Sequence, residues 1–114
     1  MQQIIDTILV AGKAPILAKV PITLGSCSVC APFTGDPDTA DRNILIKEYN
    51  LVIQALKDDP TNSITVQPPD FYALYNEDVP GGKRYDFEYS DNLHPNGIGY
   101  QSMANLWFDV LTSP

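Results

Sequence analysis

The 114-residue sequence has a single histidine, two cysteines, and only seven lysines and arginines against fourteen aspartates and glutamates. Its net charge of −7 argues against nucleic acid or an anionic membrane surface as a partner, because both bind basic patches. No apolar run approaches the ~20 residues that cross a bilayer. Residues 1–12 lack the basic start of a signal peptide and are interrupted by Asp6, so an amphipathic helix is the better interpretation.

The two cysteines, Cys27 and Cys30, have the C-x-x-C spacing of a redox pair or of half a zinc site. A zinc site needs about four ligands, and His94 is the only other soft ligand, so we predict neither metal nor cofactor. A local disulfide is expected if the protein is exported, and two thiols are expected if it is cytosolic. We favour the disulfide, and with it an extracytoplasmic location.

Apolar periodicity predicts three helices. The first covers Ile4 to Leu9, and Gly12 stands where a helix cap is expected. The second begins near Asp38 or Thr39 and ends at about Asp58. The third has Pro95 in its first turn and continues through Leu111. The apolar face of the second helix, which we expect to be buried, consists of Leu45, Tyr49, Val52, Ile53 and Leu56.

Two short apolar segments, residues 14–20 and 63–66, have the composition of buried strands, and residues 70–75 can form one or two helical turns. The order α-β-α-β-α predicts an α/β fold with parallel strands, formed by residues 1–114 as one domain or part of one. Two strands alone leave unpaired edges. We therefore expect the chain to dock on a missing N-terminal segment or on a second copy of itself.

The segment Asp91-Asn92-Leu93-His94-Pro95 places the only histidine three residues after an aspartate, just before the last helix. An imidazole oriented by a carboxylate forms the base half of a nucleophilic catalytic site, and histidine is the side chain best suited to move protons near neutral pH. The spacing lets Asp91 and His94 converge on one site from a single turn.

The longer stretch Asp91 to Tyr100, with its Asp-x-x-His-Pro-x-x-x-Gly-Tyr pattern, resembles the C-terminal motif of the SGNH/GDSL hydrolases. These are serine esterases and lipases of flavodoxin-like fold. The resemblance implies a partial three-layer α/β/α domain, the C-terminal half of that fold. It also implies His94 as general base and Asp91 as the residue that orients it, acting on a small acyl ester or an acetylated sugar without metal or cofactor.

The family's Gly-Asp-Ser nucleophile motif is absent from the sequence, as are its oxyanion-hole glycine and its Gly-x-Asn-Asp asparagine. Gly35-Asp36-Pro37 begins like the Gly-Asp-Ser motif, but proline stands in the place of serine. Ser26 lies in the loop after the first predicted strand, and its surroundings do not resemble a nucleophile turn. The nucleophile is therefore expected from outside this chain.

Three other groups of residues have a structural alternative beside a functional one. Asp36, Asp38, Asp41 and Asn43 resemble a calcium loop but fail the EF-hand pattern, so a polar loop with a helix cap is favoured. A metal site at Asp86, Glu88, Asp91 and His94 is explained more simply by the catalytic pair. A cluster of aromatic residues either lines an acyl or sugar pocket or packs a loop: Tyr72, Tyr75, Tyr85, Phe87 and Tyr89.

Two hypotheses follow. In the first, the chain is the His/Asp-bearing C-terminal part of an SGNH-type serine ester hydrolase. In the second, it is a non-catalytic fragment that self-associates, as a homo-oligomer, or binds a partner through an exposed strand edge.

Overall fold

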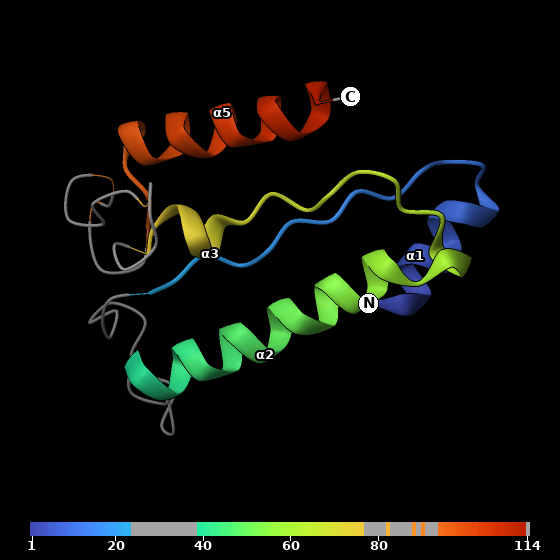
Figure 1. Cartoon of the computed structure of the whole chain (residues 1–114), viewed down its shortest axis with the longest axis horizontal. Helices are drawn as coiled ribbons and strands as arrows, with labels where there is room; N and C mark the ends of the chain where they lie inside the picture. Colours follow the sequence, from blue (N-terminus) through green and yellow to red (C-terminus); the bar gives the residue numbers. More distant parts are fainter. Residues whose placement is uncertain (24–38, 77–81, 83–87, 89, 91–93, 114) are drawn as a thin grey trace.

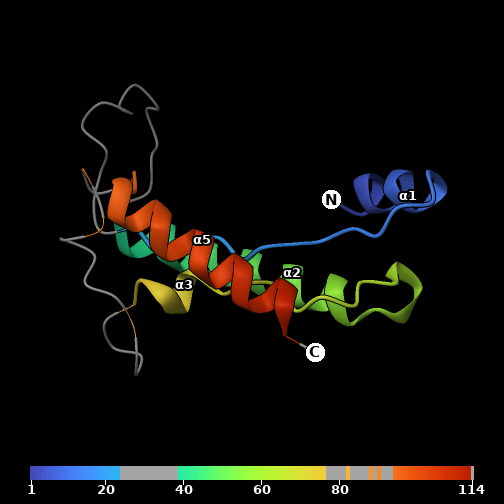
Figure 2. The same cartoon turned by 90° about the horizontal axis from the view of Figure 1, so that it is seen from above.

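The computed structural model describes residues 1–23, 39–76, 82, 88, 90 and 94–113. Its helices are α1 (Gln2–Val10), α2 (Thr39–Asp58), the 3-10 turn η1 (Pro60–Asn62), α3 (Phe71–Leu74) and α5 (Gly97–Thr112). Two extended segments, residues 13–23 and 63–70, run between α2 on one side and α5 on the other (Figures 1 and 2). None of the described helices is long and apolar enough to cross a bilayer.

The predicted helices are confirmed, and their ends have identifiable caps. At the end of α1, Gly12 has a φ of +69°, and the amides of Gly12 and Lys13 donate to the carbonyls of Leu9 and Ile8. This pattern is a Schellman cap, which favours glycine because its backbone is left-handed. Helix α2 starts at Thr39 and ends at Asp58, as predicted. The turns predicted over residues 70–75 form α3, capped by Asp70, whose carboxylate accepts from the Ala73 amide.

The predicted fold class, a partial flavodoxin-like α/β/α domain with paired parallel strands, is wrong. The described residues form no sheet, and the two extended segments meet in an isolated parallel bridge between Lys19 and Asp70. The Lys19 amide donates to the Pro69 carbonyl at 3.1 Å, which is the one backbone hydrogen bond between the two extended segments in the described part. The chain is mostly helical where it is described.

Two physical causes prevent a sheet. Proline has no amide hydrogen to donate to a ladder, and the two extended segments contain several prolines, namely Pro15, Pro21, Pro68 and Pro69. In addition, asparagines of α2 take backbone groups that a neighbouring strand would need. Asn50 pairs with the N–H and C=O of Val20, at 2.7 and 2.9 Å, and Asn43 pairs with those of Thr23, at 3.0 and 2.6 Å.

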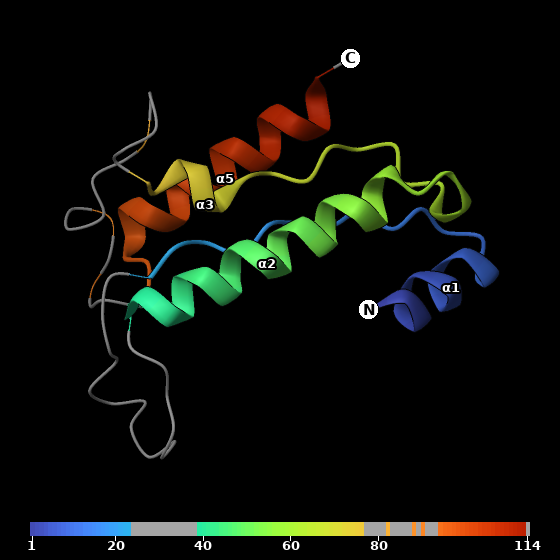
Figure 3. The ribbon, with the colours of Figure 1, turned by 60° about the horizontal axis from the view of Figure 1, so that its bottom comes forward.

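The expected burial of the apolar face of α2 is also largely wrong. Ile53 is buried, whereas Leu45, Tyr49 and Val52 are about half exposed. Asn43 and Asn50 of α2 bond the extended segment of residues 13–23, and Ile53 is buried, whereas most of the apolar stripe is in solvent. Figure 3 shows the ribbon of α2 lying alongside this extended segment. The face of α2 that carries the asparagines is turned to the extended segment, so the opposite, apolar face of α2 cannot be buried against the same segment.

Both extended segments lead, at their carboxyl ends, to the end of the molecule where α2 and α5 begin (Figure 1). Helix α1 lies at the opposite end, where Gln2 binds the buried Asn62 side chain of η1. The fold therefore gathers two helix N-termini and the ends of both extended segments on one side.

Candidate functional site

His94 is exposed and lies in a closed turn immediately before α5. The Ser90 amide and hydroxyl both donate to the His94 carbonyl, at 2.9 and 3.1 Å. One step further out, the Asn96 amide donates to the Glu88 carbonyl at 2.8 Å. These contacts hold the backbone at residue 90 close to that at residue 94.

Helix α5 begins immediately after this turn, and Asn96 defines its start. The Asn96 Oδ1 atom accepts from the amides of Ile98 and Gly99 at 2.8 and 3.0 Å. These contacts satisfy two donors that have no partner within the helix. Pro95 precedes the cap, so the helix starts two residues later than the sequence predicted. The cap fixes the direction in which the chain leaves His94.

Gly99 lets the first turn of α5 pack directly on the backbone of Glu88. It is buried, and a β-carbon at this position would overlap the Glu88 carbonyl oxygen. The Tyr75 hydroxyl donates to the Gly99 carbonyl at 2.7 Å. Tyr75 is itself buried against Ile22, Leu74 and Met103. The turn that carries His94 is thus attached to the local core.

Tyr75 and Glu88 are the buried ionisable groups of this support. Burial, together with the neighbouring Glu88 carboxylate, raises the pKa of Tyr75 to about 12. The phenol therefore stays protonated and keeps donating its hydrogen bond over the whole physiological pH range. Glu88 is 7% exposed, and its Oε2 atom has no hydrogen-bond partner within the described structure.

Several predicted site residues lie outside the described residues. They are Asp91, Ser26, Cys27, Cys30, Asp36, Asp38 and Asp86. The His94–Asp91 pair, the Ser26 alternative and the disulfide therefore stay predictions. Of the calcium-like group, the Asn43 amide is engaged with the Thr23 backbone. Within the described part, no group of three or more His, Cys, Asp or Glu residues is arranged to hold a metal ion.

The predicted aromatic cluster is only partly described. Tyr75 packs in the core. For this residue, packing is therefore observed, which was one of the two alternatives considered for the aromatic cluster. Tyr72 is half-buried, and the Lys47 ammonium lies 5.8 Å from the centre of its ring. Tyr85, Phe87 and Tyr89 lie outside the described residues.

Sequence reasoning missed the support of the turn, formed by Tyr75, Glu88 and Gly99. A signal did exist for Gly99, because a glycine inside a helix is unfavourable and indicates close backbone approach when no turn requires it. No comparable signal exists for Glu88, since a glutamate in a polar segment is normally exposed.

We compared the chain with known proteins to see whether the site belongs to a recognised family. It matches no protein-family model, no curated protein and no solved structure. The family resemblance rests chiefly on the sequence from Asp91 to Tyr100, with weaker similarity at residues 15–21, 48–50 and 70–71, and it stays a prediction.

Proposed function

We propose that the chain contributes the general base and its orienting carboxylate to ester hydrolysis of the SGNH type. His94 acts as the base, Asp91 orients it, and the nucleophilic serine and the oxyanion-hole donors come from outside these residues. The substrate class is a small carboxylic ester or an acetylated sugar.

The observation that carries the proposal is the closed turn before α5. A general base needs an accessible imidazole on a backbone that does not move during proton transfer. His94 is exposed, while its own carbonyl is bonded by Ser90 and the next turn is anchored at Glu88. These contacts support the role of His94, and its pairing with Asp91 comes from the family resemblance.

The proposed reaction has two steps. His94 takes the proton of the serine hydroxyl as its oxygen attacks the ester carbonyl, and the same proton passes to the leaving alkoxide as the carbon–oxygen bond breaks. In the second step His94 takes a proton from water, whose oxygen attacks the acyl-serine. That proton then returns to the serine, and the carboxylic acid is released.

The test uses p-nitrophenyl acetate with the purified chain and its His94→Ala, Asp91→Asn and Asp109→Asn variants. An accessible histidine attacks this activated ester by itself, so loss of rate in His94→Ala shows only that the imidazole reacts. Asp91→Asn is the diagnostic variant, and we expect it to lower the His94-dependent rate several-fold. Asp109→Asn, the same change at an exposed site near the far end of α5, should leave the rate unchanged.

The imidazole tautomer provides an independent readout of the same pair. His94 is the only histidine, so its two ring nitrogens can be assigned directly in a ¹⁵N spectrum. We expect the Nδ1-protonated form to dominate and to lose population in Asp91→Asn. Equal spectra and equal rates in the wild type and Asp91→Asn would refute the pair. Labelling of Ser26 by a fluorophosphonate would place the nucleophile in this chain and contradict an outside serine.

A second candidate function, association with another copy of the chain, is favoured by the exposed apolar surface of α2. Five apolar side chains on this helix are between 49% and 70% exposed, namely Ile44, Leu45, Tyr49, Leu51 and Val52. Several exposed apolar side chains on one helix are typical of association sites. Sedimentation velocity across a concentration series tests it, with Leu45→Gln/Val52→Gln expected to shift the chain toward monomer. A wild-type chain that stays monomeric at the highest concentration would rule it out.

A further inference from the structure

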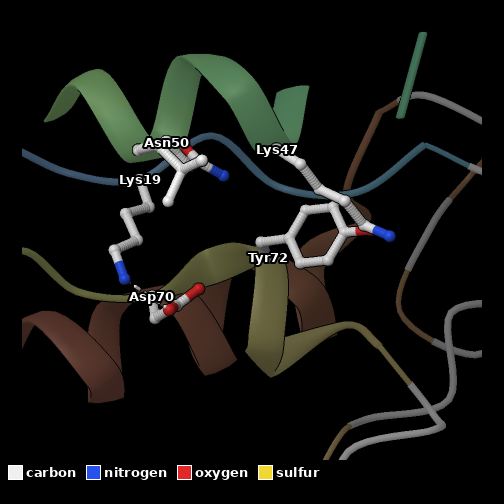
Figure 4. Close-up of a pocket in the computed structure, with 6 residues that line it drawn as sticks. Lys19, Lys47, Asn50, Asp70 and Tyr72 are labelled. Carbon is white, nitrogen blue, oxygen red and sulfur yellow. Dashed lines mark hydrogen bonds and ion pairs between the residues drawn. The ribbon is translucent and has the colours of Figure 1, made fainter. Parts of the chain in front are cut away.

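A cavity of about 340 Å³ lies between α2 and α3, near the carboxyl ends of the two extended segments (Figure 4). Its volume falls in the range of small-molecule sites. His94 is not among the residues that line it, so it is separate from the proposed catalytic turn. The lining residues are Lys19, Lys47, Asn50, Leu51, Asp70 and Tyr72.

Three of these residues are already engaged by the fold. Lys19 Nζ lies 2.8 Å from Asp70 Oδ2, which neutralises both charges. The other oxygen of Asp70 accepts from the first turn of α3. Both ends of the Asn50 amide bind the Val20 backbone. None of these groups is available to a ligand without breaking a contact that holds the chain together.

Lys47 is the charged lining residue that remains available to a ligand. Its ammonium lies over the Tyr72 ring, 5.8 Å from the ring centre, and no carboxylate of the described residues is within ion-pair distance of it. The described lining side chains carry two positive charges and one negative charge, a net charge of +1 in a chain of net charge −7. A cation without a counter-charge in a concave site attracts anions.

The rest of the accessible lining is apolar. Leu51 is 70% exposed, and the Tyr72 ring forms a second apolar wall. A ligand therefore gains by placing one anionic group at Lys47 and an apolar body against these two side chains. A phosphate dianion fits less well, since Lys47 is the only described lining residue with an ammonium outside an ion pair, and it leaves the second charge of the dianion without a partner.

We propose that this cavity binds a small organic monoanion, a carboxylate attached to an apolar aliphatic or aromatic group. The carboxylate binds Lys47 Nζ, and the apolar group packs on Tyr72 and Leu51. The inference does not depend on His94 or on hydrolysis. Binding is measured at equilibrium, so its failure and the failure of the proposed function are distinguishable.

The experiment is an NMR titration of the whole chain with benzoate, using neutral benzamide as the matched ligand. The reporters are the Tyr72 ring and the ε-methylene of Lys47. We expect saturable shifts with a dissociation constant on the order of 1–10 mM, as for other ligands of this size. Lys47→Gln should weaken binding by about tenfold or more, the value of one hydrogen bond to a charged group, whereas Lys47→Arg should retain it.

The control is Lys57→Gln, the same change on the same helix at a lysine already beside Asp58. It should alter benzoate binding by less than about twofold, since surface charges contribute little at that distance. Three outcomes overturn the proposal: equal binding of benzamide, equal weakening by Lys57→Gln, or shifts confined to the second cavity beside Val66 and Val110. Lys47 is exposed, and circular dichroism of each variant verifies that the fold is retained.

Discussion

Asn50 offers the most direct test of how α2 is held to the rest of the chain. Its side-chain oxygen accepts from the Val20 amide at 2.7 Å, and its side-chain nitrogen donates to the Val20 carbonyl at 2.9 Å. Asn50 is 8% exposed. Asn50→Ala therefore removes the hydrogen-bond partners of both the N–H and the C=O of Val20.

The expected loss follows from these two contacts. A buried backbone donor or acceptor that loses its partner costs about 1–3 kcal/mol. Val20 is half-buried, so water compensates in part, and we expect the lower end of that range for each group, or about 2–3 kcal/mol in total. Domains of this size are typically stable by only ~5–15 kcal/mol, so the change is large.

Urea unfolding followed by Trp107 fluorescence measures this loss. Trp107 is the only tryptophan, and its ring meets that of Phe71 edge-on with the centroids 6.1 Å apart. The control is Asn105→Ala, an exposed site in α5 whose amide oxygen accepts only from the Gln101 side chain. Both substitutions gain the same helix propensity, so the difference between them isolates the Val20 contacts.

Hydrogen exchange at the Val20 amide identifies the cause. We expect exchange to become faster in Asn50→Ala and to stay slow in Asn105→Ala. A difference in unfolding free energy below about 0.5 kcal/mol, or unchanged exchange at Val20, would refute the reasoning, because distant surface substitutions produce effects of that size.

Two further predictions concern the support of the His94 turn. Gly99→Ala should destabilise the chain and speed exchange of the Asn96 amide, because a β-carbon would overlap the Glu88 carbonyl, while Gly97→Ala, where the same carbon meets open space, should have neither effect. Faster exchange of the Asn96 amide in Gly97→Ala than in Gly99→Ala would contradict this packing. Tyr75 has a folded pKa of about 12, raised from 10.0 by burial and by Glu88, so its stabilising contribution is full below pH 10 and is lost as pH rises through 12. The melting temperature should therefore fall between pH 9 and pH 12, and it should fall less in Tyr75→Phe. An identical fall in the variant would show that Tyr75 does not contribute to this pH dependence.

The helices could be predicted because their signals are local. The 3.6-residue period of Ile4, Ile5 and Ile8 and the glycine at position 12 place α1 correctly. Asp70 and Asn96 cap the helices that follow them by accepting from amides only two or three residues further along the chain. Contacts this short can be inferred from the spacing of residues in the sequence. The position of His94 before α5 was predictable for the same reason.

The strands could not be predicted because strand pairing is not local. Residues 14–20 have the composition of a strand, but a strand exists only if another backbone supplies its hydrogen bonds. Here the segment of residues 63–70 supplies one backbone hydrogen bond, to the Lys19 amide. Side chains of α2 supply the hydrogen bonds of Val20 and Thr23. Nothing in the sequence near Asn43 or Asn50 indicates that their amides bind an extended segment about 20 to 30 residues away.

The two asparagines also explain why the apolar face of α2 was placed on the wrong side. Periodicity identifies the stripe of Leu45, Tyr49 and Val52 correctly, but the assumption that an apolar stripe faces the core of the same chain does not follow from it. Two bidentate amide contacts outweigh that preference here, because unpaired backbone groups of the extended segment would cost more than leaving the stripe half exposed. An apolar stripe left in solvent this way gains free energy by association, so the proposed self-association predicts a link between the oligomeric state and the Asn50 contact. If a second copy covers the stripe, loss of the Asn50 contact would free α2 to turn inward and should weaken the dimer as well as the fold.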